Sequence, residues 1–176
     1  VTPQRYGDGM EYMLMTQAFQ DHFSPNITNQ DYQNASAEFN YEIPPKLGGI
    51  FESNSGNWYS YHFWLYSLLV MPSKVIIKLL NGNQLSAYYL TNAVLYLLAI
   101  YYAYRKLKAD DKTKLVWVLL FVFNPAIFYV SWTHPEVFTY SLTCISLAMF
   151  YNKEYRKAII TLSVASTQNQ PIIFLG

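Results

Sequence analysis

Two long stretches with almost no formal charge constrain the fold of this chain more than any other feature. Residues 85–104 (LSAYYLTNAVLYLLAIYYAY) carry no charged side chain, and between Leu115 and Tyr151 the only one is Glu136. A helix of about 20 mostly apolar residues is long enough to cross the hydrocarbon layer of a bilayer. The sequence therefore predicts an all-α fold, a polytopic bundle of membrane helices.

The second stretch is too long for one helix, and the polar segment 131–136, with Pro135 inside it, is a natural corner. We expect a further helix after the basic residues near position 155, and we expect it to be truncated by the end of the chain. The predicted transmembrane domain, 85–176, thus has four helices, over residues 85–104, 115–131, 136–151 and 158–176.

The basic residues of this domain gather in two short segments, 105–114 and 152–157. Cytoplasmic loops of membrane proteins carry an excess of Lys and Arg, so both segments are expected on the cytoplasmic side. The corner at 131–136 is then extracytoplasmic, and so are residues 1–84. Nothing in the chain resembles a basic stripe interleaved with stacking aromatic residues, so no nucleic-acid partner is expected.

The N-terminal part of the chain differs from the rest in composition. Residues 1–58 hold seven acidic and two basic side chains and are rich in turn-forming residues over 40–57, which predicts an extracytoplasmic loop with one helix near 10–19. Residues 59–84 begin with many aromatic residues and are interrupted by Pro72. They are predicted to form two short amphipathic juxtamembrane helices lying along the outer membrane surface. A true span over 59–80 is the alternative.

Two acidic positions fall on the same predicted membrane face. Asp8 lies between two glycines in the first loop, and Glu136 opens a membrane helix, where burying an acid is costly enough to suggest a function. Moving a sugar onto a hydroxyl or amine needs a carboxylate for the acceptor's proton, and cationic or metal assistance for a departing phosphate. Asp8 suits the first task. Glu11, His62 and His134, with Glu136, would complete the site or hold a divalent cation.

Each of these residues also has a structural interpretation. An Asp between glycines is often a turn residue, and a Glu in the first turn of a helix interacts favourably with the helix dipole. Isolated histidines such as His62 and His134 are more often hydrogen-bonded structural residues than ligands. Glu11 would then lie on the wet face of the first helix.

Five segments follow one another in an order and topology that resemble a known family. They are residues 7–12 (GDGMEY), residues 61–66 (YHFWLY), the helix ending in Arg105-Lys106, the helix containing Asn124-Pro125, and His134-Pro135-Glu136. In this order they resemble the first-loop acidic motif, the juxtamembrane helix, the next two helices and the second acidic motif of the C-type (GT-C fold) glycosyltransferases. This family of membrane enzymes includes protein O-mannosyltransferases and lipid A aminoarabinose transferases.

The resemblance implies an activity and its catalytic residues. The chain would be an N-terminal fragment, lacking the first transmembrane helix, of an enzyme in a bacterial inner membrane. That enzyme would move a sugar from a polyprenyl- or dolichyl-phosphate donor to an acceptor lipid, glycan or protein on the extracytoplasmic face. Asp8 would be the catalytic base or the acid that orients the acceptor, and Glu136 its partner. A divalent metal ion is the one cofactor considered, with Asp8, Glu136 and His134 as candidate ligands.

Five residues are candidates for substrate binding: Glu11, His62, His134, Lys74 and Lys78. The two lysines lie four residues apart and would share one helix face toward lipid headgroups, where the resemblance suggests contact with the donor's phosphate. The sequence departs from the family in one place, because Ser60-Tyr61-His62 stands where many relatives have a Lys-Pro-Pro-like stretch.

Two other functions remain open. The function of a polytopic transporter or flippase would depend on the polar residues 168–170 rather than on Asp8. A non-catalytic membrane assembly protein would depend on neither acid.

Overall fold

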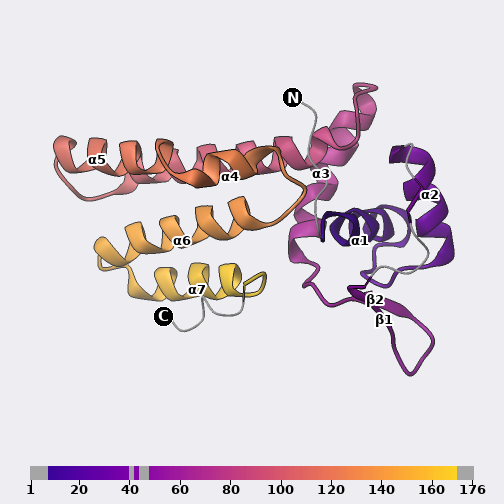
Figure 1. The fold of residues 1–176 in the computed structure, drawn as a ribbon. Coiled ribbons are helices and arrows are strands. Elements are labelled where there is room, and N and C mark those ends of the chain that lie inside the picture. Colours follow the sequence, from indigo (N-terminus) through magenta and orange to yellow (C-terminus); the bar gives the residue numbers. More distant parts are fainter. Residues whose placement is uncertain (1–7, 40–41, 44–47, 170–176) are drawn as a thin grey trace. The chain divides into compact units, whose positions relative to one another are not determined.

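The structure, a computed structural model, describes residues 8–39, 42–43 and 48–169, and helices dominate these residues (Figure 1). The elements follow in the order α1 Gly9–His22, α2 Asn29–Phe39, β1 Ile50–Glu52, β2 Trp58–Ser60, α3 Leu65–Leu79, α4 Ser86–Lys106, α5 Asp111–Val122, η1 Pro125–Ser131, α6 Glu136–Tyr151 and α7 Tyr155–Ser166. The coarse expectation of a mainly α-helical chain is therefore correct.

The chain forms two compact units. Unit 1 comprises Val1–Thr91 together with Ser131–His134, and unit 2 comprises Asn92–Val130 together with Pro135–Gly176. The predicted domains 1–58, 59–84 and 85–176 were divided by their placement relative to a membrane, and that division stays a prediction. The start of the acidic motif (Gly7), the Pro44-Pro45 pair and the end of the last expected helix, including Gln170, lie outside the described residues.

Unit 1 is built around α1, which packs against both α2 and α3. The apolar residues near 10–19 predicted this helix, and it extends to His22, where Phe23 adopts a left-handed conformation (φ 55°) just before Pro25. Hydroxyl groups line the contact with α3 and the start of α4. The Thr16 hydroxyl donates to the Tyr12 carbonyl at 2.8 Å, and the Tyr88 hydroxyl donates to Thr16 at 3.0 Å.

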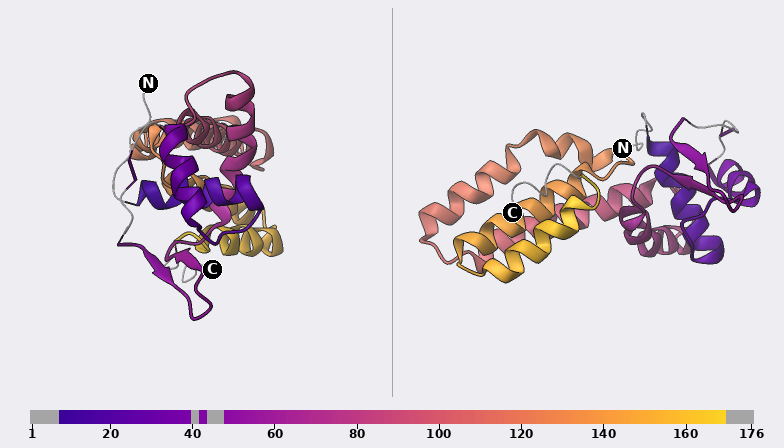
Figure 2. Two further views of the ribbon diagram at one scale, coloured as in Figure 1. Left: turned by 90° about the vertical axis from the view of Figure 1, so that its right-hand side faces the viewer. Right: turned by 90° about the horizontal axis from the view of Figure 1, so that it is seen from below.

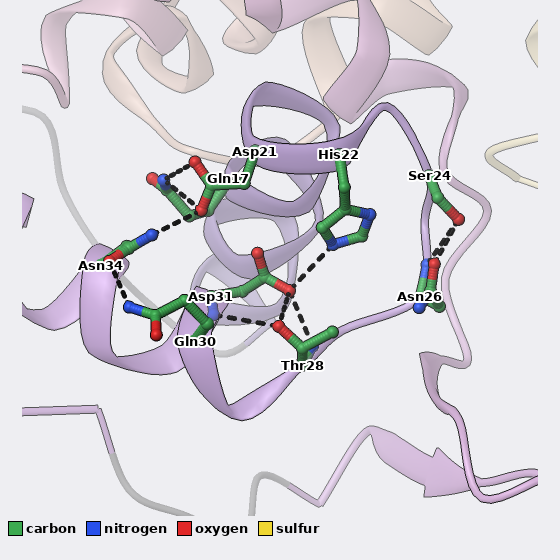
Figure 3. A network of polar contacts seen from close by, with 9 residues as sticks. All are labelled: Gln17, Asp21, His22, Ser24, Asn26, Thr28, Gln30, Asp31 and Asn34. Atoms are coloured by element: carbon green, nitrogen blue, oxygen red, sulfur yellow. Dashed lines mark hydrogen bonds and ion pairs between the residues drawn. The ribbon is translucent and has the colours of Figure 1, made fainter.

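Helix α2 starts at a reciprocal cap that the sequence interpretation missed (Figure 3). The backbone N–H of Asp31 donates to the Thr28 hydroxyl at 3.2 Å, and the backbone N–H of Thr28 donates to the Asp31 carboxylate at 2.7 Å. This is a capping box with Asp in place of the usual Glu. Nε2 of His22, at the end of α1, lies 3.1 Å from the same carboxylate and ties the two helices together.

The expected loop over 40–57 contains regular structure. Strands β1 and β2 form an antiparallel hairpin in which Phe51 pairs with Tyr59. Its connection turns at Gly56, whose φ of 79° is a conformation that glycine adopts at little cost. The two short helices expected over 59–84 are also wrong, because α3 is one continuous helix with Pro72 in its interior.

The helix expected over 85–104 is α4, most of which belongs to unit 2, and the helix expected over 136–151 is α6 of unit 2, with the same bounds as predicted. The helix expected over 115–131 is broken. Helix α5 begins at Asp111, where the Asp110 side chain accepts from the backbone N–H of Thr113, and it ends at Val122. Pro125 then opens the 3₁₀ helix η1, because proline cannot donate the hydrogen bond that would continue α5.

Helices α6 and α7 form an antiparallel hairpin and lie side by side (Figure 2). Their tight connection passes through Lys153, which has a φ of 63°. The side chain of Asn152 links this connection to the segment between α4 and α5, since it accepts from the backbone N–H of Lys108 at 2.7 Å and donates to the Lys106 carbonyl at 2.8 Å. Nζ of Lys108 also lies 3.6 Å from Glu154. The two basic segments of the sequence therefore meet at one end of unit 2.

In the interior of unit 2, two small side chains and one aromatic ring are almost fully buried: Ala99, Ala103 and Phe121. Among the described residues, none of the helices alone is both long and apolar enough to cross a bilayer. The pair formed by α5 and η1, bent by 51°, passes that test by length and composition when taken together.

Candidate functional site

The first turn of α1 places two predicted acids on the same side of the helix. Asp8 is the N-cap residue, and its carbonyl accepts from the backbone N–H of Glu11 at 2.9 Å. Residues three apart on a helix are neighbours on its surface, so both carboxylates face the same space. A helix N-terminus also favours negative charge, which stabilises the acids there.

His62 completes the group from the segment that follows β2. Its Nε2 lies 3.1 Å from a carboxylate oxygen of Asp8 and 3.5 Å from a carboxylate oxygen of Glu11. The three side chains differ in exposure: Asp8 is 52% exposed, His62 is 31% exposed, and Glu11 is 8% exposed. The site thus has one carboxylate open to solvent and one held behind it.

The buried carboxylate of Glu11 is held in place by the β-hairpin region. The Ser60 hydroxyl donates to it at 2.8 Å, and the same hydroxyl accepts from the backbone N–H of His62 at 3.0 Å. Gly49 lies directly against this carboxylate, and a Cβ there would collide with it. Burial raises the pKa of Glu11, opposed by the hydrogen bond from Ser60 and the nearby charge of His62. The wet-face interpretation of Glu11 is therefore wrong.

A second histidine lies near the same aromatic ring. The ring of Tyr12 is 5.2 Å from the ring of His62 and 6.2 Å from the ring of His134. His134 and its neighbour Thr133 are buried, and both lie so close to Gly9 that a Cβ at Gly9 would collide with the Thr133 hydroxyl. The two predicted histidines are thus both placed beside the N-terminus of α1.

Asp8, Glu11 and His62 could hold a divalent cation. One ligand atom from each lies within 4.8 Å of the others. Ligands at about 2.1 Å from a tetrahedral metal are about 3.4 Å apart, and the two distances from His62 are close to that separation. Two carboxylates and an imidazole suit Zn²⁺ or Mn²⁺. Glu11 and His62 were among the residues expected to complete the site or hold a cation, and Asp8 was one of three candidate ligands with Glu136 and His134; a metal role for those two stays a prediction.

The two lysines predicted to bind the donor's phosphate have different surroundings. Lys74 is 1% exposed, and its ammonium group donates to Glu38 at 2.7 Å and to the Gln17 side chain at 2.6 Å. Burial lowers the pKa of Lys74, opposed by its hydrogen bond to Glu38. Lys78, one turn later, is exposed. The expectation that both share a face toward lipid headgroups is therefore wrong for Lys74; their role in binding substrate stays a prediction.

Glu136 is the first residue of α6 and is exposed. It belongs to unit 2, whereas Asp8 belongs to unit 1. The predicted pairing of these two acids stays a prediction. The position of Glu136 in the first helical turn also fits the structural interpretation, since an acid there complements the helix dipole.

Sequence reasoning missed the residues that support the site. The Ser60 hydroxyl donates to the Glu11 carboxylate, Gly49 leaves room for that carboxylate, and the ring of Tyr12 lies near both histidines. The sequence interpretation treated Gly49 only as one of the turn-forming residues over 40–57. Ser60 stands where the resembling family has a different stretch, and this departure was the one available sign that the supporting residues differ here.

The arrangement suits proton transfer at Asp8. With a proton on Nε2, His62 donates to the exposed carboxylate of Asp8 and fixes its orientation, while the second oxygen stays available to solvent or a substrate. The raised pKa of the nearby Glu11 is typical of groups at functional sites, although structural carboxylates also show it. No family model, no curated protein and no solved structure matches this chain.

Proposed function

We propose that this chain is part of a membrane glycosyltransferase that takes its sugar from a polyprenyl- or dolichyl-phosphate donor. The observation that carries the proposal is the convergence of Asp8, Glu11 and His62, which come from α1 and from the segment after β2. Two of these residues lie in segments that resemble the acidic motif of the C-type glycosyltransferases, and the third lies in the segment that resembles their juxtamembrane helix.

Asp8 would act as the base of an inverting transfer. Its exposed oxygen accepts the proton of the acceptor hydroxyl as the acceptor oxygen bonds to the anomeric carbon of the sugar. The bond between that carbon and the phosphate oxygen breaks, and its electron pair leaves with the lipid phosphate. His62 holds Asp8 in position, and Glu11, fixed by Ser60, places a second carboxylate beside His62.

A metal ion held by Asp8, Glu11 and Nε2 of His62 would replace the proton that His62 otherwise donates to Asp8, and would supply Lewis-acid stabilisation of the departing phosphate. The chain's own groups would still position the substrates. Because the Glu11 carboxylate is buried and Asp8 is half exposed, a substrate would approach from the side of Asp8.

The surface of unit 2 supports a membrane location. Long faces of its helices carry no charge, and many large apolar or aromatic side chains are more than half exposed. They are Leu97, Leu98, Tyr101, Tyr104, Leu115, Val116, Leu120, Phe123, Phe128, Leu147, Phe150, Tyr151, Tyr155, Ile159 and Ile160. Exposed apolar surface on this scale is typical of a membrane or protein interface. The meeting of the basic segments at one end of unit 2 fits the positive-inside rule.

Sugar release from polyprenyl-phosphate sugars tests the proposal. We expect turnover by the whole protein in lipid to fall at least about a hundredfold for Asp8→Asn, because losing a general base typically costs that much. His62→Gln should cost less, since its amide can still donate to Asp8. Glu52→Gln, which removes an exposed acid of the hairpin, is the matched control and should leave turnover unchanged.

Three other outcomes would count against the proposal. Turnover that survives both Asp8→Asn and Glu136→Gln would remove the proposed site. If folded protein released no sugar from any donor but moved a solute across the bilayer, the transporter interpretation would replace the proposal. If the protein had neither activity, the assembly-protein interpretation would replace it.

A further inference from the structure

A second candidate site lies in unit 2, where α4 ends and α5 begins. The residues there line an open pocket of about 240 Å³. The cavity is lined by two tyrosines, three basic residues and one acid, which are Tyr101, Tyr104, Arg105, Lys106, Lys114 and Asp111. None of these residues belongs to the site at Asp8.

The charge of this cavity is not balanced. Among the described residues, the side chains of Arg105 and Lys106 form no ion pair or hydrogen bond. The third cation, Lys114, lies 3.9 Å from Asp111, whose side chain is fully exposed to solvent. An ion pair this long and this exposed is weak. The three cations are therefore only partly neutralised, by Asp111 in the lining and by the neighbouring Asp110, which interacts electrostatically with Lys114.

The segment between the two helices is held in one conformation. The Asn152 side chain binds the backbone of both Lys106 and Lys108, and Asp110 caps α5 through the backbone N–H of Thr113. The cationic side chains of the cavity are thus attached to fixed backbone. A ligand that binds there would not have to pay for ordering this loop.

The neighbouring surface indicates what kind of molecule carries the anion. Tyr101 and Tyr104 are each more than half exposed, and the next exposed side chains along α4 and α5, such as Leu98 and Leu115, are apolar. Tyrosines between an apolar face and a group of basic residues are typical of the bilayer interface. Basic pockets at this level bind the phosphate groups of anionic lipids.

We propose that Arg105, Lys106 and Lys114 bind a phosphate group, and that this phosphate is the headgroup of an anionic membrane lipid. Arg105 can make two parallel hydrogen bonds to phosphate oxygens, while the lysines act as point charges. The lipid's acyl chains would lie along the apolar faces of α4 and α5. The proposal rests on the membrane location given under the proposed function, but not on the transferase chemistry.

Lipid adducts measured by native mass spectrometry would test this site. The full chain is purified in neutral detergent and titrated with phosphatidylglycerol or phosphatidylcholine. We expect the combined change Arg105→Gln, Lys106→Gln and Lys114→Gln to weaken phosphatidylglycerol binding at least tenfold and to leave phosphatidylcholine binding unchanged. Each cation near a lipid phosphate contributes about fivefold in affinity.

The matched control removes three cations from the same end of unit 2 but outside the cavity. Lys108→Gln, Lys112→Gln and Lys153→Gln together should change phosphatidylglycerol binding by less than about threefold. Equal losses in the two triple variants would mean that lipid is attracted by diffuse charge, and would overturn the proposal. If the cavity triple variant lost its helical circular dichroism, the single change Arg105→Gln, with an expected loss of about fivefold, would replace it.

Two further measurements distinguish a lipid phosphate from a soluble phosphate, and lipid binding from sugar transfer. Inorganic phosphate that binds as tightly as phosphatidylglycerol, with the same sensitivity to the cavity variants, would overturn the lipid assignment and reassign the site to a soluble phosphate. Asp8→Asn should keep full phosphatidylglycerol binding. A protein that binds the lipid through these residues but transfers no sugar would refute the proposed function and leave this inference standing.

Discussion

Unit 1 buries charged side chains, whereas the buried polar side chains of unit 2 are hydroxyls and amides. In unit 1 the buried charges are Glu11, Asp31 and Lys74, and each has a hydrogen-bonding or ionic partner. In unit 2 no charged residue is buried among the described residues, and large apolar side chains face outward instead. A buried charge requires partners fixed in place, while an exposed apolar surface requires something other than water beside it.

The difference shows which forces position each unit's functional residues. Unit 1 fixes its site through specific polar contacts that connect α1, α2, α3 and the hairpin. Unit 2 packs helices through alanines and serines, as when the Ser146 hydroxyl donates to the Ala158 carbonyl at 2.8 Å across α6 and α7. In unit 1, single substitutions should therefore change stability mainly by removing a hydrogen-bonding or ionic partner. In unit 2, they should act mainly by changing the polarity of the exposed surface.

The largest expected effect is that of Lys74→Met. This change leaves Glu38 and Gln17 without their cationic partner in the interior of unit 1. Removing one member of a buried pair typically costs 3–5 kcal/mol, so we expect the free energy of unfolding to fall by about 4 kcal/mol. Reversible denaturation followed by circular dichroism measures it. Lys78→Met, one turn away on the same helix and exposed, should change stability by less than about 0.5 kcal/mol.

The pH dependence of the free energy of unfolding, compared between wild type and Lys74→Met, tests the burial of Lys74 separately. Burial lowers the pKa of Lys74 in the folded state below its ordinary value of 10.5, so the fold favours the neutral amine. Wild type should accordingly gain stability relative to Lys74→Met as the pH rises from the lowered pKa toward 10.5, and lose that gain as the pH falls through the lowered pKa. A stability difference that does not change with pH would show that Lys74 is not desolvated.

The second largest effect should come from Leu97→Lys, in the middle of α4. Leu97 is 63% exposed, so in water the substitution would change stability by no more than about 0.5 kcal/mol. In a bilayer, a lysine at the centre of a membrane helix costs about 3 kcal/mol of insertion free energy. The fraction of chains inserted into microsomes measures this cost. Leu79→Lys, the same change at an exposed position of unit 1, should cost less than about 1 kcal/mol of insertion free energy.

Equal effects of the two leucine substitutions would break the comparison between the units. If both were small, the apolar surface of unit 2 would face a protein partner or water, and the membrane part of the proposed function would fail. If both were large, α3 would lie within the bilayer, as in the alternative of a span over 59–80.

Much of the helical framework could be predicted from the sequence because it follows local rules. Helix α6 lies between Pro135 and a basic turn, and its apolar run predicted both of its ends. Helix α2 was missed because it is polar and its capping box uses Asp31, which is less diagnostic than Glu. The break between Val122 and Pro125 was missed because apolar side chains continue through it, even though Pro125 itself predicts a boundary.

The candidate site could be predicted only in part, for a different reason. Asp8 and Glu11 are three residues apart on one helix, so local geometry alone brings them together. His62 lies about fifty residues further along the chain, and only the packing of α1 against α3 and the hydrogen bond from Ser60 to Glu11 place its ring beside them. Similarly, Lys74 and Lys78 look equivalent in sequence, but the burial of one of them depends on Glu38, which belongs to another helix.

The smallest expected effect on stability is that of Gly49→Ala. This change distinguishes a structural role of Glu11 from a role in the candidate site. The new methyl group would collide with the Glu11 carboxylate and push it away from the Ser60 hydroxyl. Losing a hydrogen bond to a charged group costs about 1.5–3 kcal/mol, and part of this should be recovered because the displaced carboxylate becomes hydrated. We therefore expect a loss of about 1 kcal/mol in the free energy of unfolding.

Gly48→Ala is the matched control, because a Cβ at Gly48 meets no atom within 4 Å among the described residues. It should change neither stability nor turnover. If Glu11 serves the site at Asp8, Gly49→Ala should lower sugar transfer by more than its small loss of stability explains, since the protein remains folded in both variants. A Gly49→Ala protein with lowered stability and full turnover would make Glu11 a structural residue of unit 1 and leave Asp8 and His62 as the functional pair.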